Sequence, residues 1–402
     1  GGTVIGPTGF PLFTSLLPSS APTNQTSVAT ELDNAIGSGV TLPLAFLNLF
    51  NLSPSNLASA LTELSGEVGT AVAPAGIQAM NSFLLLVSSP FANNRGFTPP
   101  PQPRIVEKSL VFEATPEPSR WGIWTAGYGG QTNVNGNSVV GSSNRSENAF
   151  AGVIGLDYRI TPYTLVGFAL AGGGTNYDLS GGLGGGRGDM FQSAVYSFTR
   201  IDAAYLSATL AYAWQRESTN RTLMLTGTDQ LTAGFSTNDI GGRIEGGYRF
   251  ANPEMPALGF IPYAALQMQA FFTPSYNESA AFGSPQFALA YNAQTTTTGR
   301  TELGAWFDDN IALGDGAILS LLTRAAWAYD FWSKYSITAA FQQLPGSAFT
   351  VLGAAPTRNS LLASGGAQIS FGNGFSLAGL FDTNLNGDWR TYTGYLQLRY
   401  AW

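Results

Sequence analysis

The residues of this chain that could do chemistry are charged side chains placed at alternate positions of otherwise apolar segments. In 239–250, arginine and glutamate alternate with isoleucine, glycine and aromatic residues. Such charges can neutralise one another in a wet interior, hold a polypeptide there, or set ion selectivity. We expect them to line the inside of the molecule. The set is Arg243, Glu245, Arg249, Arg300, Glu302 and Arg324.

The sequence gives little support for catalytic, phosphate-binding or metal-binding sites. The chain has no histidine and no cysteine, which excludes serine–histidine–aspartate hydrolysis, histidine or thiolate metal sites and disulfides. The glycine-rich stretch 181–188 lacks the lysine and hydroxyl residue of a phosphate-binding loop, so we expect a flexible surface loop. Asp308–Asn310 and 178–182 are expected to be solvated turn residues rather than calcium ligands. No catalytic residue, metal or cofactor is therefore predicted.

The composition limits the class of protein. Only 11% of the 402 residues are charged, 12% are aromatic, and 49 are glycine. The mean hydropathy is +0.06, and the longest apolar run, 83–87, is far below the ~20 residues of a transmembrane helix. The net charge of −7 argues against nucleic-acid binding. An extracellular β-solenoid, a secreted β-sandwich and an outer-membrane β-barrel remain.

Residues 121–402 alternate apolar and polar positions in segments longer than ordinary globular strands. Short turns alternate with long polar loops, and aromatic residues collect beside the short turns, which is typical of an outer-membrane barrel. A soluble sandwich is the alternative. We expect an all-β membrane protein, a 12-stranded antiparallel transmembrane barrel. Its strands are expected near 122–133, 147–160, 164–178, 188–199, 203–219, 231–250, 258–273, 288–308, 316–332, 358–371, 375–385 and 391–402.

The last segment has one apolar face although it ends the sequence given. Termini usually fray, and an apolar edge strand promotes aggregation. In a closed barrel the last strand pairs with the first, so neither strand has a free edge. The residues on this face are Leu396, Leu398, Tyr400 and Trp402.

The N-terminal third differs in character from the barrel region. Residues 1–23 are expected to be extended, and 24–95 to be helical. Ser53 and Pro54 are a helix N-cap and first helical residue, and a second helix is expected over 74–87. The proline-rich stretch 96–120 is expected to be an irregular connector.

Several motifs together resemble the translocator unit of monomeric (type V) autotransporters. The resemblance covers nearly the whole chain from residue 24 onward. The similar segments are "TSVATELDNAI" with "LSPSNLASALTELSGEVGTA" before the barrel, "WTAGYGGQTNVNGN" at 124–137, "GVIGLDYRI" at 152–160, "GGRIEGGYRF" at 241–250 and the terminal "YLQLRYAW".

The resemblance implies a barrel in the bacterial outer membrane with a helix threaded through its lumen. It implies an N-terminal passenger, folding by the barrel-assembly machinery with the last strand as assembly signal, and contact with outer-membrane lipid and lipopolysaccharide. The helix is rather apolar, so its polar face, Gln78, Asn81 and Ser82, is expected to meet the lumenal charges. Self-cleavage at Asn81 is not expected, because the local motif does not match. A stand-alone porin-like barrel with an N-terminal plug is the alternative function.

Overall fold

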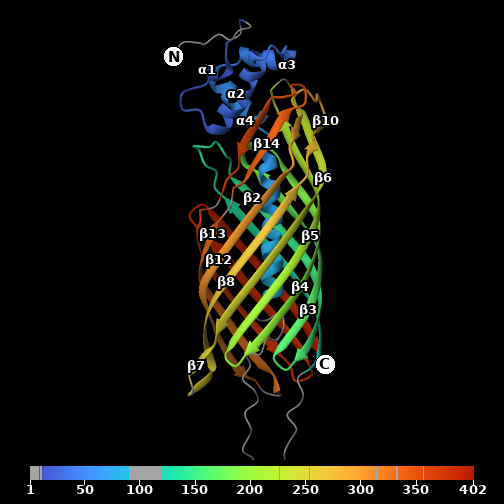
Figure 1. Cartoon of the computed structure of the whole chain (residues 1–402), viewed down its shortest axis with the longest axis vertical. Coiled ribbons are helices and arrows are strands. Elements are labelled where there is room, and N and C mark those ends of the chain that lie inside the picture. The colour runs from blue at the N-terminus through green and yellow to red at the C-terminus, as the bar shows by residue number, and fades with distance from the viewer. Residues whose placement is uncertain are drawn as a thin grey trace, which may run out of the picture.

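The computed structural model describes residues 9, 11–89, 119–225, 227–252, 254–313, 316–331, 334–355 and 357–402. Twelve antiparallel strands form a closed barrel that surrounds one helix (Figure 1). Each strand pairs with its neighbours along the chain, β6 pairs with β8, and β1 pairs with β18 to close the ring. The barrel strands are β1 (Trp121–Val134), β2 (Arg145–Thr161), β3 (Thr164–Leu179), β4 (Gly185–Ile201), β5 (Ala204–Leu223), β6 (Asp229–Tyr248), β8 (Met255–Thr273), β12 (Gln294–Ala312), β13 (Ile318–Phe331), β16 (Asn359–Ser370), β17 (Phe375–Leu385) and β18 (Trp389–Ala401).

Strand β5 illustrates why this sequence forms a barrel. Successive side chains of a strand point to opposite faces, and in β5 one face is buried while the other is exposed. Leu210 and Trp214 are exposed on the outside, whereas Thr209 and Gln215 are buried inside. A soluble sheet would bury its apolar face, so this inverted pattern places the outer face in lipid.

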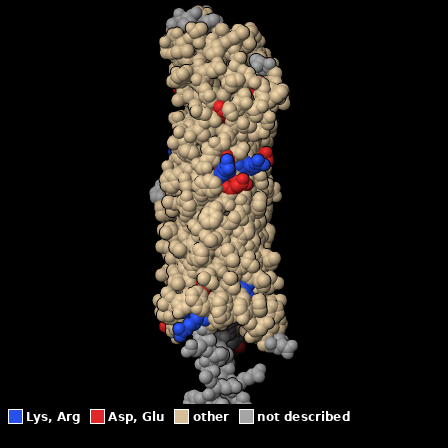
Figure 2. All heavy atoms as spheres, turned by 90° about the vertical axis from the view of Figure 1, so that its right-hand side faces the viewer, with Lys and Arg blue, Asp and Glu red and all other residues tan. Residues whose placement is uncertain are grey.

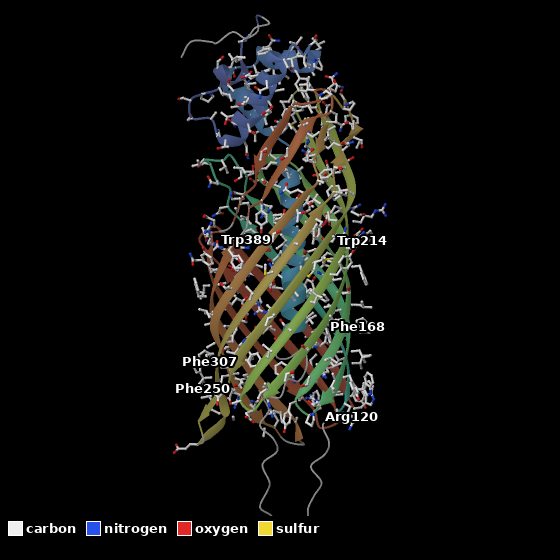
Figure 3. All side chains as sticks on the ribbon, in the orientation of Figure 1. Arg120, Phe168, Trp214, Phe250, Phe307 and Trp389 are labelled. Carbon is white, nitrogen blue, oxygen red and sulfur yellow. The ribbon has the colours of Figure 1, made fainter. Side chains whose placement is uncertain are left out.

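Aromatic rings form a girdle at one end of the barrel. The rings of Trp121 and Tyr158 lie 4.6 Å apart, and those of Phe375 and Tyr400 are also 4.6 Å apart. Figure 3 places Phe250 and Phe307 near this lower end. Short turns join the strands here, so we call it the short-turn end, and the opposite end the long-loop end. Aromatic girdles mark the boundary between membrane and water.

The long-loop end carries a second, smaller sheet above the barrel. Its order is β15-β14-β11-β9. Strand β10 extends the edge of β6 at the same end, whereas β7 lies beside β8 at the short-turn end. These short strands are β7 (Phe250–Asn252), β9 (Tyr276–Asn277), β10 (Ser279–Phe282), β11 (Leu289–Tyr291), β14 (Ser336–Phe341) and β15 (Ala348–Leu352); a 3-10 turn, η3 (Ser180–Gly182), follows β3.

Four α-helices and one 3-10 helix cover this sheet and form what we call the cap (Figure 1). As predicted, Ser53 is the N-cap of the last of them, accepting a hydrogen bond from the Asn56 N–H, and Pro54 follows. One hydrophobic core joins the cap to the small sheet, with Phe46 packed edge-on against Phe287 and Phe341. The cap comprises α1 (Phe13–Leu16), α2 (Thr23–Gly37), α3 (Leu44–Leu47), η1 (Asn48–Asn51) and α4 (Pro54–Leu64).

After the cap, η2 (Glu67–Ala71) leads into α5 (Val72–Ser88), which descends inside the barrel. Glu67–Ser88 is long and apolar enough to cross a membrane by length and composition, with 83% of its most apolar window buried. The count of uninterrupted apolar runs did not reveal this segment, because small and uncharged polar residues interrupt it. Glu67 is its only charged residue.

The structure corrects four further expectations. Residues 13–16 are helical rather than extended, held by Asp33, which accepts hydrogen bonds from the Phe13 and Thr14 N–H groups. The expected strand 288–308 is divided between β11 and β12, and β14 and β15 were not expected. Residues 185–188 belong to β4, not to a loop. Of the connector 96–120, all but the last two residues lie outside the described residues.

Candidate functional site

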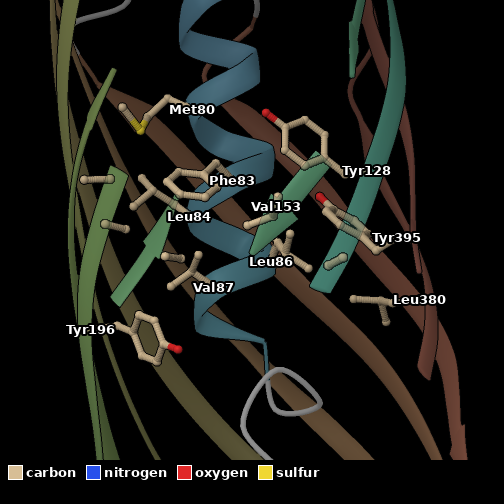
Figure 4. Close-up of a cluster of buried hydrophobic side chains, with 14 of the residues drawn as sticks. Met80, Phe83, Leu84, Leu86, Val87, Tyr128, Val153, Tyr196, Leu380 and Tyr395 are labelled. Atoms are coloured by element: carbon tan, nitrogen blue, oxygen red, sulfur yellow. The ribbon is translucent and has the colours of Figure 1, made fainter. Parts of the chain in front are cut away.

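The lumen around α5 is the candidate site, and the helix occupies it asymmetrically. Its apolar face packs against β1–β6 (Figure 4). Phe83 and Leu84 lie there in one hydrophobic cluster with small lumenal side chains, including Ala169, Ala194 and Ala213. Small residues on this half of the wall leave room for the helix. The apolar character of α5 is explained by this contact.

The polar face of α5 meets the other half of the wall. The Asn81 Oδ1 accepts hydrogen bonds from the side-chain amides of Gln267, at 2.5 Å, and Gln269. Gln78 and Ser82 line a cavity together with Asn81, Gln267 and several of the lumenal charges. A main-chain contact adds to these, because the Tyr128 hydroxyl donates to the Ala79 carbonyl at 3.2 Å. The helix is thus oriented by polar contacts and packed by apolar ones.

The charged wall is a network of buried ion pairs. Arg243 donates to both carboxylate oxygens of Glu302, at 2.8 and 2.9 Å, and to Glu245 at 2.6 Å. Arg324 lies between Glu302, at 3.6 Å, and Asp382, and its guanidinium is 5.0 Å from the Trp306 ring centre. All are buried. Buried pairs of this kind fix geometry more than they add stability.

The two remaining predicted residues lie at other levels of the same wall. Arg300 pairs with Asp330 at 2.7 Å and lines the cavities beside α5. Arg249 pairs with Asp308 at 3.0 Å near the short-turn end, away from the helix. The six residues therefore all face the lumen or its mouth, and none of them shows a direct hydrogen bond to α5 among the described residues.

Small polar cavities run along the polar side of the helix. Two of about 40 Å³ each share Gln78, Asn81 and Arg300, and a third of about 20 Å³ lies above them beside Gly69 and Tyr276. Each has room for one or a few water molecules. None of these three cavities is large enough to hold a second polypeptide segment beside α5, and we refer to this lumen-filling helix as the plug.

Sequence reasoning missed a second lumenal cluster below the plug. Asp157 accepts hydrogen bonds from Tyr196, Arg399 and the Trp124 indole N–H. These residues come from β1, β2, β4 and β18, so the cluster lies across the seam that closes the barrel. Inward charges on the first and last strands were the available signal, since Asp157 and Arg399 both occupy polar positions of alternating segments.

The contacts that hold the cap were also missed. Asn24 donates to the Leu352 carbonyl and accepts from its N–H, both at 2.9 Å. Glu67 accepts from the Ser143 N–H at 2.7 Å and from its hydroxyl at 3.0 Å. Burial raises the pKa of Glu67, and these hydrogen bonds oppose the shift only in part. Arg221 joins the barrel to the cap, donating to Glu278 in the small-sheet region and to the Glu63 carbonyl of α4.

The lumenal groups considered for self-cleavage are engaged by other side chains. Asn81 is held by two glutamine amides, and the Glu245 and Glu302 carboxylates are both engaged by Arg243. Within the described residues, no group of three or more acidic side chains converges on a site that could hold a metal ion.

Comparisons with known proteins agree with this geometry. The family model of the autotransporter beta-domain matches residues 123–382. The chain is similar in structure to the translocator domain of the autotransporter NalP from Neisseria meningitidis, with a TM-score of 0.60 and 12% identity, covering 83% of this chain and 99% of that one. It is also similar to the beta domain of the Bordetella autotransporter BrkA, with a TM-score of 0.53 and 18% identity, covering 70% and 100%. No curated protein matched in sequence. At these identities the structural matches show the fold alone.

Proposed function

Because this chain belongs to the autotransporter β-domain family, we propose that it is an outer-membrane translocator, which exports an N-terminal passenger and anchors it at the cell surface. The observation that carries the proposal is the path of the chain. The cap lies at the long-loop end, α5 descends through the lumen, and β1 starts at the short-turn end, where Trp121 and Trp402 exchange backbone hydrogen bonds. Long loops face the cell exterior in outer-membrane barrels. Anything joined ahead of the cap would therefore be outside.

The contacts of the cap and plug support the proposed anchoring role. A passenger joined to α1 would be tethered to a cap that shares a hydrophobic core with the barrel loops. It would also be tethered by a helix that is buried along most of its length. Withdrawing the helix would expose its apolar face and break the Asn81 contacts with Gln267 and Gln269. The proposed role of the lumenal residues is to hold the helix after export, with the charged wall neutralised by its own pairs.

The proposal includes partners during assembly. The proposed assembly signal for the barrel-assembly machinery consists of three outward residues of β18 and the residue that follows it: Leu396, Leu398, Tyr400 and Trp402. They are exposed on the lipid-facing side of the strand that closes the barrel. No enzymatic role is proposed for this domain.

The absence of cysteine makes topology directly measurable. Single cysteines are introduced at Leu44, a cap residue that is 73% exposed, and at Asn373, in the short turn between β16 and β17. Intact cells are then treated with a membrane-impermeant maleimide. We expect L44C to be labelled in intact cells and N373C only after permeabilisation. The reverse pattern would contradict the orientation.

Export itself is tested with a reporter epitope fused ahead of residue 11. We expect the epitope to be accessible on intact cells and to remain attached to the barrel. If the epitope stays inside the cell while L44C is still labelled at the surface, the barrel assembles but does not export, and the porin-like alternative gains support. Deleting the cap and α5 is expected to raise single-channel conductance in planar bilayers.

A further inference from the structure

A charged patch interrupts the outer surface of the barrel at one level. Figure 2 shows Arg or Lys and Asp or Glu side chains gathered on the face formed by β3–β5, above a broad uncharged band. On these strands the exposed charged residues toward the long-loop end are Asp178, Arg187, Asp189 and Arg216. We call them the interface patch. A charged side chain at the centre of a bilayer is costly, so the patch marks where the lipid tails end.

The band below the patch confirms this level. From Arg216 toward the short-turn end, the outward positions of β5 include Trp214, Tyr212 and Leu210, all exposed. Figure 3 shows Trp214 and Phe168 on this outer side, with Trp214 higher. Aromatic residues concentrate where tails meet headgroups. The interface patch therefore lies at headgroup height, immediately beyond an aromatic row.

The two arginines of the patch are neighbours on adjacent strands. Arg216 is directly opposite Asp189, and Arg187 is opposite Ser218, two residues further along β5. The Cα atoms at such diagonal positions are ~7–8 Å apart. Arginine side chains are long enough to span this distance, so both guanidinium groups can contact one ligand. Within the described part of the chain, neither guanidinium lies within 4.0 Å of a carboxylate oxygen. Both keep free donors for an external acceptor.

We propose that Arg187 and Arg216 bind a phosphate group of a phosphorylated glycolipid in the outer leaflet. This deepens the proposed function, because it requires the long-loop end to face the cell exterior. Guanidinium groups match phosphate oxygens with two parallel hydrogen bonds. Asp178 and Asp189 cancel the formal charge of the patch, so the attraction comes from short-range hydrogen bonds rather than a long-range field. Asp189 opposes the phosphate and limits the affinity.

The site is tested with purified full-length chain in mixed micelles titrated with diphosphoryl lipid A. The net contribution of one hydrogen bond corresponds to about fivefold in affinity. We expect R187Q or R216Q to weaken binding about fivefold and the double variant roughly 25-fold. The matched control is R390Q, because Arg390 is also exposed on the outer face but lies opposite Asn133 and Leu385, without a second arginine. R390Q should change the affinity by less than about twofold.

A variant that is expected to strengthen binding distinguishes lipid recognition by the patch from a merely structural role of its residues. D189N should tighten binding of diphosphoryl lipid A, whereas a merely structural role predicts no change or a loss. Binding by the double variant within about twofold of the unsubstituted chain would overturn the proposal. So would an equal loss for lipid A without phosphates, or full competition by inorganic phosphate, which would identify a free-anion site. The cysteine labelling above tests the orientation separately, so failure of either idea can be recognised.

Discussion

Gly76 of α5 offers the sharpest test of how the plug is held. A β-carbon at this position would lie 2.8 Å from the Gln215 Nε2 and would collide with the ring of Phe271, a fully buried residue of β8. The helix is thus pressed onto the barrel wall at a point where only glycine fits. We predict that Gly76→Ala loosens the plug although alanine is the better helix former.

The expected change in the stability of the docked helix is the balance of two opposing effects of Gly76→Ala. Replacing glycine by alanine inside a helix contributes about 1 kcal/mol of stability. Overpacking a rigid interior costs about 1–3 kcal/mol, and a buried ring puts this site in the upper part of that range. The helix could relieve the clash only by moving toward the cavity beside Gln78, which would stretch the Asn81 contacts. We expect a net loss of about 1–2 kcal/mol.

The assay uses Ser82→Cys, a buried position on the polar face of α5, as a reporter in the purified protein. Labelling of this cysteine by a small maleimide reports how often the plug opens. A loss of 1–2 kcal/mol should raise the labelling rate about 5–30-fold. Gly37→Ala is the matched control, because a β-carbon there meets nothing within 4 Å. An unchanged rate in Gly76→Ala would refute the tight contact between α5 and the wall.

Three further predictions concern the charged wall and the cap. Glu302→Gln should lower stability by about 3 kcal/mol, measured by urea unfolding, because the Arg243 guanidinium loses a bidentate partner in a buried site; no shift in the midpoint would contradict the network. Burial raises the pKa of Glu67, so its contribution to docking the cap is present below its ordinary value of 4.5 and falls as the pH rises through its folded pKa. Limited proteolysis of the cap should show this dependence, and Glu67→Gln should remove it. Asn24→Ala leaves both backbone groups of Leu352 without their side-chain partner and should cost about 1–2 kcal/mol, seen as faster proteolysis of the cap at constant barrel stability.

The barrel could be predicted because its signal is local. Alternate residues of each strand face lipid and the lumen, so their types alternate between apolar and polar. In 391–402, for example, Leu396 and Leu398 face lipid, whereas Gln397 and Arg399 face the lumen. The helix N-cap at Ser53 is equally local, since a single side chain and the next three residues form it. Neither feature depends on distant parts of the chain.

The small sheet and the cap could not be read in this way. Strands β14 and β15 have six and five residues, too few for alternation to be distinct from chance. Their pairing depends on β11 and on helices more than 200 positions earlier in the chain, as the bond between Asn24 and Leu352 illustrates. Pairing between such distant segments leaves no local pattern in the sequence.

The sequence by itself determined that charged residues face a lumen and that α5 has a polar side. It could not determine which charges meet. In the strand register, Arg243 of β6 is opposite Gln267 of β8, which is opposite Arg300 of β12. The bidentate partner of Arg243 is nevertheless Glu302, two residues further along β12. That choice follows from barrel closure and from the space left by a helix packed against the alanine-lined half of the wall. Alternation is a property of each strand, whereas pairing across a lumen is a property of the closed ring and its plug.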